Sequence, residues 1–136
     1  MRKSAILCVD DEPLVLRSIK RELDYAFGDE YVYESAENAD EALELIRELY
    51  QEGFVIVAIV SDWLMPGMKG DEFLIQVHQQ FPDIVMILLT GHATEEAVNR
   101  AVSQQALHYY LSKPWDGKEL IDCIETGLAK VKALAK

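Results

Sequence analysis

The sequence is poor in cysteine, in positive charge and in long apolar runs, and each shortage excludes a class of protein. Its two cysteines, Cys8 and Cys123, lie in apolar segments, so they are expected to be reduced, buried small hydrophobes rather than a disulfide. Thirteen Lys and Arg against 24 Asp and Glu give a net charge of −11, which opposes binding to nucleic-acid phosphates. The longest apolar run, residues 54–60, is far below the ~20 residues of a membrane-spanning helix. No signal-peptide core follows Met1, so a cytoplasmic location is expected.

A chain of 136 residues, 50% hydrophobic and 27% charged, has the size and composition of one globular domain. Short apolar runs alternate with segments of helical periodicity along its whole length. The predicted strands cover residues 5–9, 31–35, 54–60, 84–89 and 107–111. The predicted helices cover residues 12–27, the segment from Asn38 to near Gly53, and residues 71–81, 94–105 and 116–135. This alternation predicts an α/β fold, a doubly wound (βα)5 sandwich of flavodoxin type with helices on both faces of a parallel sheet.

The polarity of the strands favours one strand order. The first, third and fourth strands are uniformly apolar, whereas the second and fifth carry polar side chains. This fits the order 2-1-3-4-5, which has the second and fifth strands at the edges, although other doubly wound sheets also have polar edges. Residues 1–128 are expected to form the domain, and residues 129–136 to be a helix extension or the start of a linker.

Residues able to carry chemistry follow the carboxyl ends of four predicted strands, where ligands bind in an open parallel sheet. They are Asp10 and Asp11, Asp62, Thr90 and Lys113. Taken singly, the aspartates and Thr90 can cap helices, and Lys113 can be a surface lysine. Together, carboxylates crowded at one edge raise one another's pKa unless a cation neutralises them. Oxygen ligands suit Mg²⁺ (or Mn²⁺), and a carboxylate beside it, with Lys113 and Thr90 for phosphoryl oxygens, predicts a site that accepts a phosphoryl group.

Four strings at these strand ends resemble the receiver domain of bacterial response regulators, and the resemblance covers nearly the whole chain. They are VDDEP at residues 9–13, SDWLMPG at 61–67, LTG at 89–91 and YLSKP at 110–114. The resemblance implies that Asp62 is the phosphoacceptor and takes a phosphoryl group from a phosphohistidine of a partner protein. It further implies that Mg²⁺ is held by Asp10, Asp11, Asp62 and the main-chain carbonyl of Leu64.

The resemblance also assigns the surroundings of the phosphoryl group. It implies that Lys113 and Thr90 bind phosphoryl oxygens and that the small Gly91 leaves space beside them. Thr90 and Tyr110 would form the switch, with Tyr110 turning inward when Thr90 moves. The alternative is that Tyr110 is an ordinary edge-strand tyrosine, whereas Tyr109 is out of phase and is expected on the opposite face. The Lys113-Pro114 peptide bond is expected to be cis, as is usual in the family.

Two positions flank the path of a hydrolytic water and are expected to tune the lifetime of the phosphoryl group. Leu64 is apolar and cannot orient that water, which predicts a long-lived phosphoryl group. His92 can position water, bind metal weakly or be a solvated loop residue, and the last interpretation is favoured. His78 and His108 are isolated in the sequence and have no predicted role.

The resemblance implies a signalling protein rather than an enzyme, one that catalyses only its own phosphorylation and dephosphorylation. The expected partners are a sensor histidine kinase or a histidine phosphotransfer protein, and a downstream effector or a fused output domain. A homodimer through the face of the fourth helix, fifth strand and fifth helix is a further candidate. Direct contacts with nucleic acid or membrane are not expected.

Two other functions fit parts of the pattern. A haloacid dehalogenase-like phosphatase also uses a strand-end aspartate, Mg²⁺ and a lysine. Such phosphatases need a second aspartate at the position where this chain has Leu64. They also lack the aspartate doublet that this chain has after its first strand. A flavodoxin-like cofactor binder needs a Ser/Thr-rich phosphate loop after the first strand, where this chain has acids. Neither a dinucleotide glycine fingerprint nor a nucleotide P-loop is present.

Overall fold

Five parallel strands form one sheet in the order β2-β1-β3-β4-β5 in the computed structural model, which describes residues 3–89, 91, 98–99, 102 and 109–134. The strands are β1 (Lys3–Val9), β2 (Val32–Ala36), β3 (Phe54–Ser61), β4 (Val85–Leu89) and β5 (Tyr109–Leu111). The predicted strand order and the flavodoxin-like α/β fold are therefore confirmed, with the polar strands β2 and β5 at the two edges.

Helices follow the strands as the periodicity predicts. They are α1 (Pro13–Phe27), the short 3-10 helix η1 (Gly28–Glu30), α2 (Ala39–Gln51), α3 (Gly70–Gln80) and α5 (Gly117–Leu134). The helix predicted over residues 94–105 lies largely outside the described residues, although Val98, Asn99 and Val102 are described and are helical. Among the described residues, no helix has the length and apolar character needed to cross a membrane.

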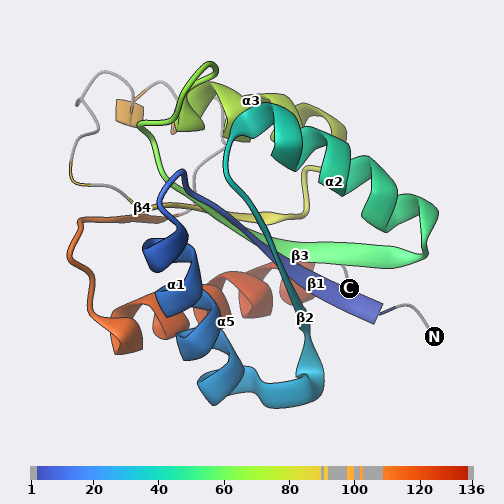
Figure 1. The fold of residues 1–136 in the computed structure, drawn as a ribbon. Helices are drawn as coiled ribbons and strands as arrows, with labels where there is room; N and C mark the ends of the chain where they lie inside the picture. The colour runs from blue at the N-terminus through green and yellow to red at the C-terminus, as the bar shows by residue number, and fades with distance from the viewer. Residues whose placement is uncertain (1–2, 90, 92–97, 100–101, 103–108, 135–136) are drawn as a thin grey trace.

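Helices α2 and α3 lie on one face of the sheet and α1 and α5 on the other (Figure 1). An apolar layer of the core lies between the sheet and each pair of helices. Side chains of β1 alternate between them: Leu7 and Val9 join the layer under α2 and α3, whereas Ile6 and Cys8 join the layer under α1 and α5. Every residue of β4 is buried. Because both faces are covered, the inner strands must be apolar on both sides, which explains their uninterrupted hydrophobic runs.

Both cysteines belong to the layer under α1 and α5, and both are free thiols. Cys8 is fully buried, and burial raises the pKa of its thiol to about 12. Cys123 is only half-buried, so the expectation of two reduced cysteines agrees with the structure but the expectation of full burial is wrong for Cys123. Cys123 lies on α5 one residue before the buried Ile124 and packs against the layer without being enclosed by it.

Helices α2 and α1 begin in different ways. The side chain of Asn38 caps α2 and accepts a hydrogen bond of 2.8 Å from the main-chain N–H of Glu41. Helix α1 begins instead at Pro13, whose fixed φ suits a first helical turn. Asp10 accepts the N–H of Glu12 at 2.9 Å, before the helix begins. The capping interpretation therefore accounts for only one oxygen of Asp10.

Tyr33 joins the edge strand β2 to the end of α1. Its hydroxyl lies 2.7 Å from the carbonyl oxygen of Gly28 and 3.2 Å from that of Leu23, so it donates its proton to these helix-end acceptors. Gly28 has φ of +56°, a left-handed conformation that glycine adopts easily and that ends α1. Burial, followed by the charge of Asp24, raises the pKa of Tyr33 to about 12.

The raised pKa of Tyr33 predicts a specific loss of stability in alkali. The neutral hydroxyl stabilises the fold fully below the usual tyrosine pKa of 10, and this contribution disappears as the pH rises to about 12. Tyr33→Phe should lower the free energy of unfolding at pH 8 by about 1 kcal/mol. It should also weaken the fall in stability between these two pH values. Denaturant unfolding followed by circular dichroism measures both effects, with Tyr25→Phe as a control because Tyr25 is 93% exposed. Equal pH profiles for the wild type and Tyr33→Phe would contradict the assignment.

Candidate functional site

Three carboxylates meet beyond the carboxyl ends of β1 and β3. One oxygen from each of Asp10, Asp11 and Asp62 lies within 4.8 Å of the others. Main-chain hydrogen bonds hold two of these residues, since the N–H of Asp62 donates to the carbonyl of Val9 at 2.8 Å and that of Asp10 to the carbonyl of Ala36 at 3.1 Å. The strand ladders thus continue one step past the strands, and the parallel register itself brings the carboxylates together.

Lys113 reaches this acidic cluster from the chain that follows β5. Its Nζ lies 2.7 Å from Oδ2 of Asp10 and 3.4 Å from Oδ2 of Asp62. The peptide bond between Lys113 and Pro114 is cis, as expected. The structure therefore brings together four of the predicted site residues, contributed by three different strand ends.

Burial controls the electrostatics of the cluster. Asp10 and Asp62 are only 1% and 5% exposed. Burial raises the pKa of Asp10, the hydrogen bonds from Lys113 and Glu12 counteract part of this, and the charge of Asp62 raises the pKa further. Burial alone would lower the pKa of Lys113, but the hydrogen bond and charge of Asp10, together with Asp62, outweigh it and raise that pKa. The sequence led us to expect that repulsion among the carboxylates raises their pKa values. At Asp10, burial raises the pKa more than this repulsion does.

The donor set of the cluster fits a divalent cation. Asp10, Asp11 and Asp62 offer carboxylate oxygens, the ligands that Mg²⁺ prefers in proteins. One lysine cannot neutralise three carboxylates, so the cluster retains negative charge that a cation would balance. Asp11 is exposed, which leaves one side of the cluster open to water and to a ligand. The side chain of Leu64 is 44% exposed, and the predicted use of its main-chain carbonyl as a further ligand stays a prediction.

The segment between Asp62 and α3 is tied back to the first turn of that helix. The main-chain N–H of Trp63 donates to Oδ1 of Asp62 at 2.8 Å, and the N–H of Gly70 donates to the carbonyl of Trp63 at 2.9 Å. A Cβ on Gly70 would collide with the carbonyl oxygen of Asp62 and lie 2.8 Å from Cα of Trp63. Only glycine therefore allows α3 to begin this close to Asp62.

Comparison with known proteins gives the family. The family model of the response regulator receiver domain matches residues 6–125. The chain belongs to this family. The receiver domain is similar to the hydrogenase transcriptional regulatory protein HoxA of Cupriavidus necator, with 32% identity over 123 residues that cover 90% of this chain and 24% of that protein. It is 29% identical to the DNA-binding transcriptional regulator NtrC of Escherichia coli over 129 residues, 95% of this chain and 26% of that protein.

Solved structures give the same family assignment. The signal receiver domain of an HD domain-containing protein from Pseudomonas fluorescens Pf-5 has a TM-score of 0.84 and 28% identity, covering 99% of this chain and 93% of that chain. A CheY-like response regulator receiver domain from Methanospirillum hungatei JF-1 has a TM-score of 0.83 and 27% identity, covering 96% and 98%. The predicted membership of the response regulator receivers is confirmed, and the chain spans about a quarter of the length of HoxA and NtrC.

Of the three predicted site residues that follow β4, Gly91 is among the described residues, whereas Thr90 and His92 are not. Thr90 and His92 lie outside the described residues, so the phosphoryl contact of Thr90 and the tuning role of His92 stay predictions. Gly91 is described and exposed, and a Cβ there would lie 3.6 Å from the carbonyl oxygen of Lys113, an ordinary contact. The predicted role of Gly91 in leaving space beside the phosphoryl group stays a prediction.

The two tyrosines of β5 lie on opposite faces, as their alternation predicts. Tyr109 is half-buried against the layer under α1 and α5, whereas Tyr110 is 38% exposed. This separation leaves Tyr110 as the candidate for the switch, a role that stays a prediction.

Two side chains beside the receiver site were not predicted from the sequence. The indole N–H of Trp63 donates to Oδ1 of Asp71 at 2.8 Å, and Asp71 is only 1% exposed. In the sequence, Asp71 is an acid at the start of a predicted helix, where acids are common because the helix dipole favours them. The sequence therefore gives no sign that the Asp71 carboxylate is buried and bonded to Trp63.

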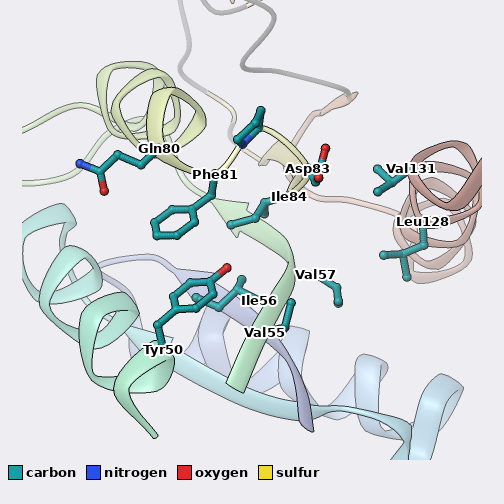
Figure 2. Close-up of a pocket in the computed structure, with 11 residues that line it drawn as sticks. Tyr50, Val55, Ile56, Val57, Gln80, Phe81, Asp83, Ile84, Leu128 and Val131 are labelled. Carbon is teal, nitrogen blue, oxygen red and sulfur yellow. The ribbon is translucent and has the colours of Figure 1, made fainter. Parts of the chain in front are cut away.

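An apolar pocket lies at the amino end of the sheet, opposite the acidic cluster (Figure 2). It has a volume of about 340 Å³ and extends from the stacked rings of Tyr50 and Phe81 to Leu128 and Val131 of α5. Asp83 is the one carboxylate among the described residues that line it. This apolar pocket lacks clustered oxygen ligands, so the acidic cluster is the candidate functional site.

Two glycine substitutions test how tightly the receiver site is packed. Gly70→Ala should lower the free energy of unfolding by about 2 kcal/mol or more, because the new methyl group would displace the main chain at Asp62. Gly91→Ala is the matched control and should change stability by less than about 0.5 kcal/mol, because the described atoms nearest to its methyl group are 3.6 Å away or more. Thermal or denaturant unfolding measures both, and equal effects would contradict the described close approach at Gly70.

Proposed function

We propose that this receiver domain accepts a phosphoryl group on Asp62 in a Mg²⁺-dependent reaction and signals through a change of its binding surface. The observation that carries the proposal is the meeting of Asp10, Asp11 and Asp62 within 4.8 Å, with Lys113 in contact with two of them. A buried nucleophile beside other acids is unfavourable for stability alone, and such arrangements are typical of functional sites.

The proposed reaction is a displacement at phosphorus. An oxygen of the Asp62 carboxylate forms a bond to the phosphorus of a phosphohistidine, while the phosphorus–nitrogen bond breaks and its electron pair leaves with the imidazole, which takes up a proton. The N–H of Trp63 holds Oδ1 of Asp62, and Lys113 faces Oδ2. The ammonium group of Lys113 is therefore placed to bind an oxygen of the transferred group, where negative charge develops.

Asp10, Asp11 and Asp62 are the described side chains that would hold Mg²⁺, or Mn²⁺ in its place. When bound, the ion supplies positive charge that stabilises the phosphoryl oxygens during transfer. Lys113 already contacts Asp10 and Asp62, so its side chain must share these carboxylates with the metal.

A sensor histidine kinase or a histidine phosphotransfer protein is the proposed donor, and an effector or output domain is the proposed recipient of the signal. Support comes from the relatives, which include the sensor kinase CckA of Brucella abortus, 32% identical over 93% of this chain, and transcriptional regulators. A beryllofluoride-activated NtrC4 receiver, 25% identical with a TM-score of 0.79, is described as a dimer. We extend this to a homodimer of the present domain through α5, β5 and the helix predicted before β5. The cytoplasmic location stays a prediction.

Phosphorylation at Asp62 can be tested by intact mass after incubation with acetyl phosphate and Mg²⁺. The wild type should gain one phosphate, and Asp62→Asn should gain none, because an amide is a poor nucleophile. Asp83→Asn removes a carboxylate from the opposite end of the sheet and is the matched control, which should be labelled like the wild type. Chelation of the metal should abolish labelling. Equal labelling of Asp62→Asn and wild type would place the acceptor elsewhere.

Turnover separates the receiver from the phosphatase alternative. We propose that the domain is not an enzyme acting on other substrates, because Leu64 occupies the position where a haloacid dehalogenase-like phosphatase needs an aspartate. Incubation with p-nitrophenyl phosphate and Mg²⁺ should therefore release about one nitrophenol per protein molecule within the lifetime of the phosphoryl group. Many turnovers per molecule would favour the phosphatase.

Leu64 is proposed to prolong the life of the phosphoryl group. Leu64 stands two residues after Asp62 in the sequence. It is 44% exposed, and its apolar side chain cannot form a hydrogen bond with an attacking water. Leu64→Asn should speed phosphate loss by about tenfold, equivalent to ~1.4 kcal/mol of barrier. Leu64→Met keeps an apolar side chain of similar volume and should leave the rate unchanged. Release of inorganic phosphate from the labelled protein measures the rate, and an unchanged or slower loss from Leu64→Asn would reject the idea.

A further inference from the structure

Trp63, the residue after Asp62, is fixed at three polar points. Its main-chain N–H donates to Oδ1 of Asp62 at 2.8 Å, and its carbonyl accepts the N–H of Gly70 at 2.9 Å. Its indole N–H donates to Oδ1 of Asp71 at 2.8 Å. Two of these bonds lead to the first turn of α3 and one leads to Asp62, so Trp63 links the helix to that carboxylate.

Asp71 is buried beyond what a helix start requires. It is only 1% exposed, whereas an acid in a first helical turn is favoured there even when it remains in water. Burying a carboxylate is costly unless hydrogen bonds compensate for the lost hydration. The indole of Trp63 supplies one such bond at 2.8 Å, so the buried carboxylate of Asp71 and this ring hold each other.

Apolar contacts alone do not fix the orientation of Trp63. The ring packs on the layer under α2 and α3, and the Nζ of Lys69 lies 5.7 Å from its centroid. These contacts are weakly directional, since a flat ring can slide or tilt within an apolar surface. The bond to Asp71 is directional, so it fixes the orientation of the indole and adds a side-chain anchor to the two main-chain bonds of Trp63.

We propose that Asp71 is a positioning residue for the phosphoacceptor. Acting through the indole of Trp63, it keeps the Trp63 N–H on Oδ1 of Asp62 and so holds the carboxylate with Oδ2 toward Lys113. The inference rests on the proposed function, since it concerns the rate at which Asp62 accepts a phosphoryl group. Misplacing a reacting group by about 1 Å can cost on the order of 100-fold in rate, so a contact outside the acidic cluster can influence the reaction.

Three variants separate positioning from simple stabilisation. Asp71→Leu removes the acceptor and keeps a similar volume, whereas Asp71→Asn keeps a side-chain oxygen that accepts the indole N–H. Trp63→Phe keeps an aromatic ring and removes the donor. The rate of labelling by acetyl phosphate is measured by mass at saturating Mg²⁺, after circular dichroism has shown that each variant is folded.

Asp71→Leu and Trp63→Phe should each slow labelling by about tenfold, and Asp71→Asn should restore the rate to within about threefold of wild type. The double variant Asp71→Leu with Trp63→Phe should be no slower than the slower single variant, because both changes break the same bond.

Wild-type rates in Trp63→Phe would overturn the positioning role, whether or not Asp71→Leu folds. An Asp71→Asn variant as slow as Asp71→Leu, or a double variant slowed by about 100-fold, would also overturn it. These outcomes leave the proposed function intact as long as the wild type is labelled. An unlabelled wild type would instead reject the proposed function itself.

Discussion

The contact of Lys113 with two buried aspartates is the interaction on which the site depends. Asp10 follows β1, Asp62 follows β3 and Lys113 follows β5, so residues far apart in the sequence share one ion pair network. Buried carboxylates without a cation would favour their neutral forms or open the edge of the sheet. The lysine compensates for part of the negative charge, so three carboxylates stay together at the edge of a stable sheet, as the proposed phosphoryl transfer requires.

The fold supplies the geometry that this network needs. Strand β1 lies between β2 and β3, and the hydrogen bonds that Asp10 and Asp62 donate extend its pairings with both. Side chains at these positions are therefore held by main-chain bonds rather than by a flexible loop. The two ends of the sheet differ: the carboxyl end carries the acids and Lys113, whereas the amino end carries an apolar pocket lined on one side by the stacked rings of Tyr50 and Phe81.

The strand order and most of the acidic cluster were predictable because they follow from local patterns. Uninterrupted apolar runs identify strands covered on both faces, and parallel strands bring their carboxyl ends to one edge. Contacts that depend on the path of a loop were not predictable. The bond between Trp63 and Asp71 forms only because Gly70 lets α3 approach Asp62. Similarly, burial raises the pKa of Asp10 more than repulsion does, because the end of β1 is buried. The composition of the chain does not reveal this burial.

The buried thiol of Cys8 has a practical consequence for following the motions of this domain. Since burial raises the pKa of Cys8 to about 12, almost none of it is present near neutral pH as the thiolate, the form that attacks an alkylating reagent. Modification of Cys8 therefore requires the apolar layer under α1 and α5 to open, so its rate in native buffer reports how often that layer opens. Cys8 stands two residues before Asp10. Its rate of alkylation therefore reports opening of the core close to the strand end that carries the acids, without an engineered cysteine.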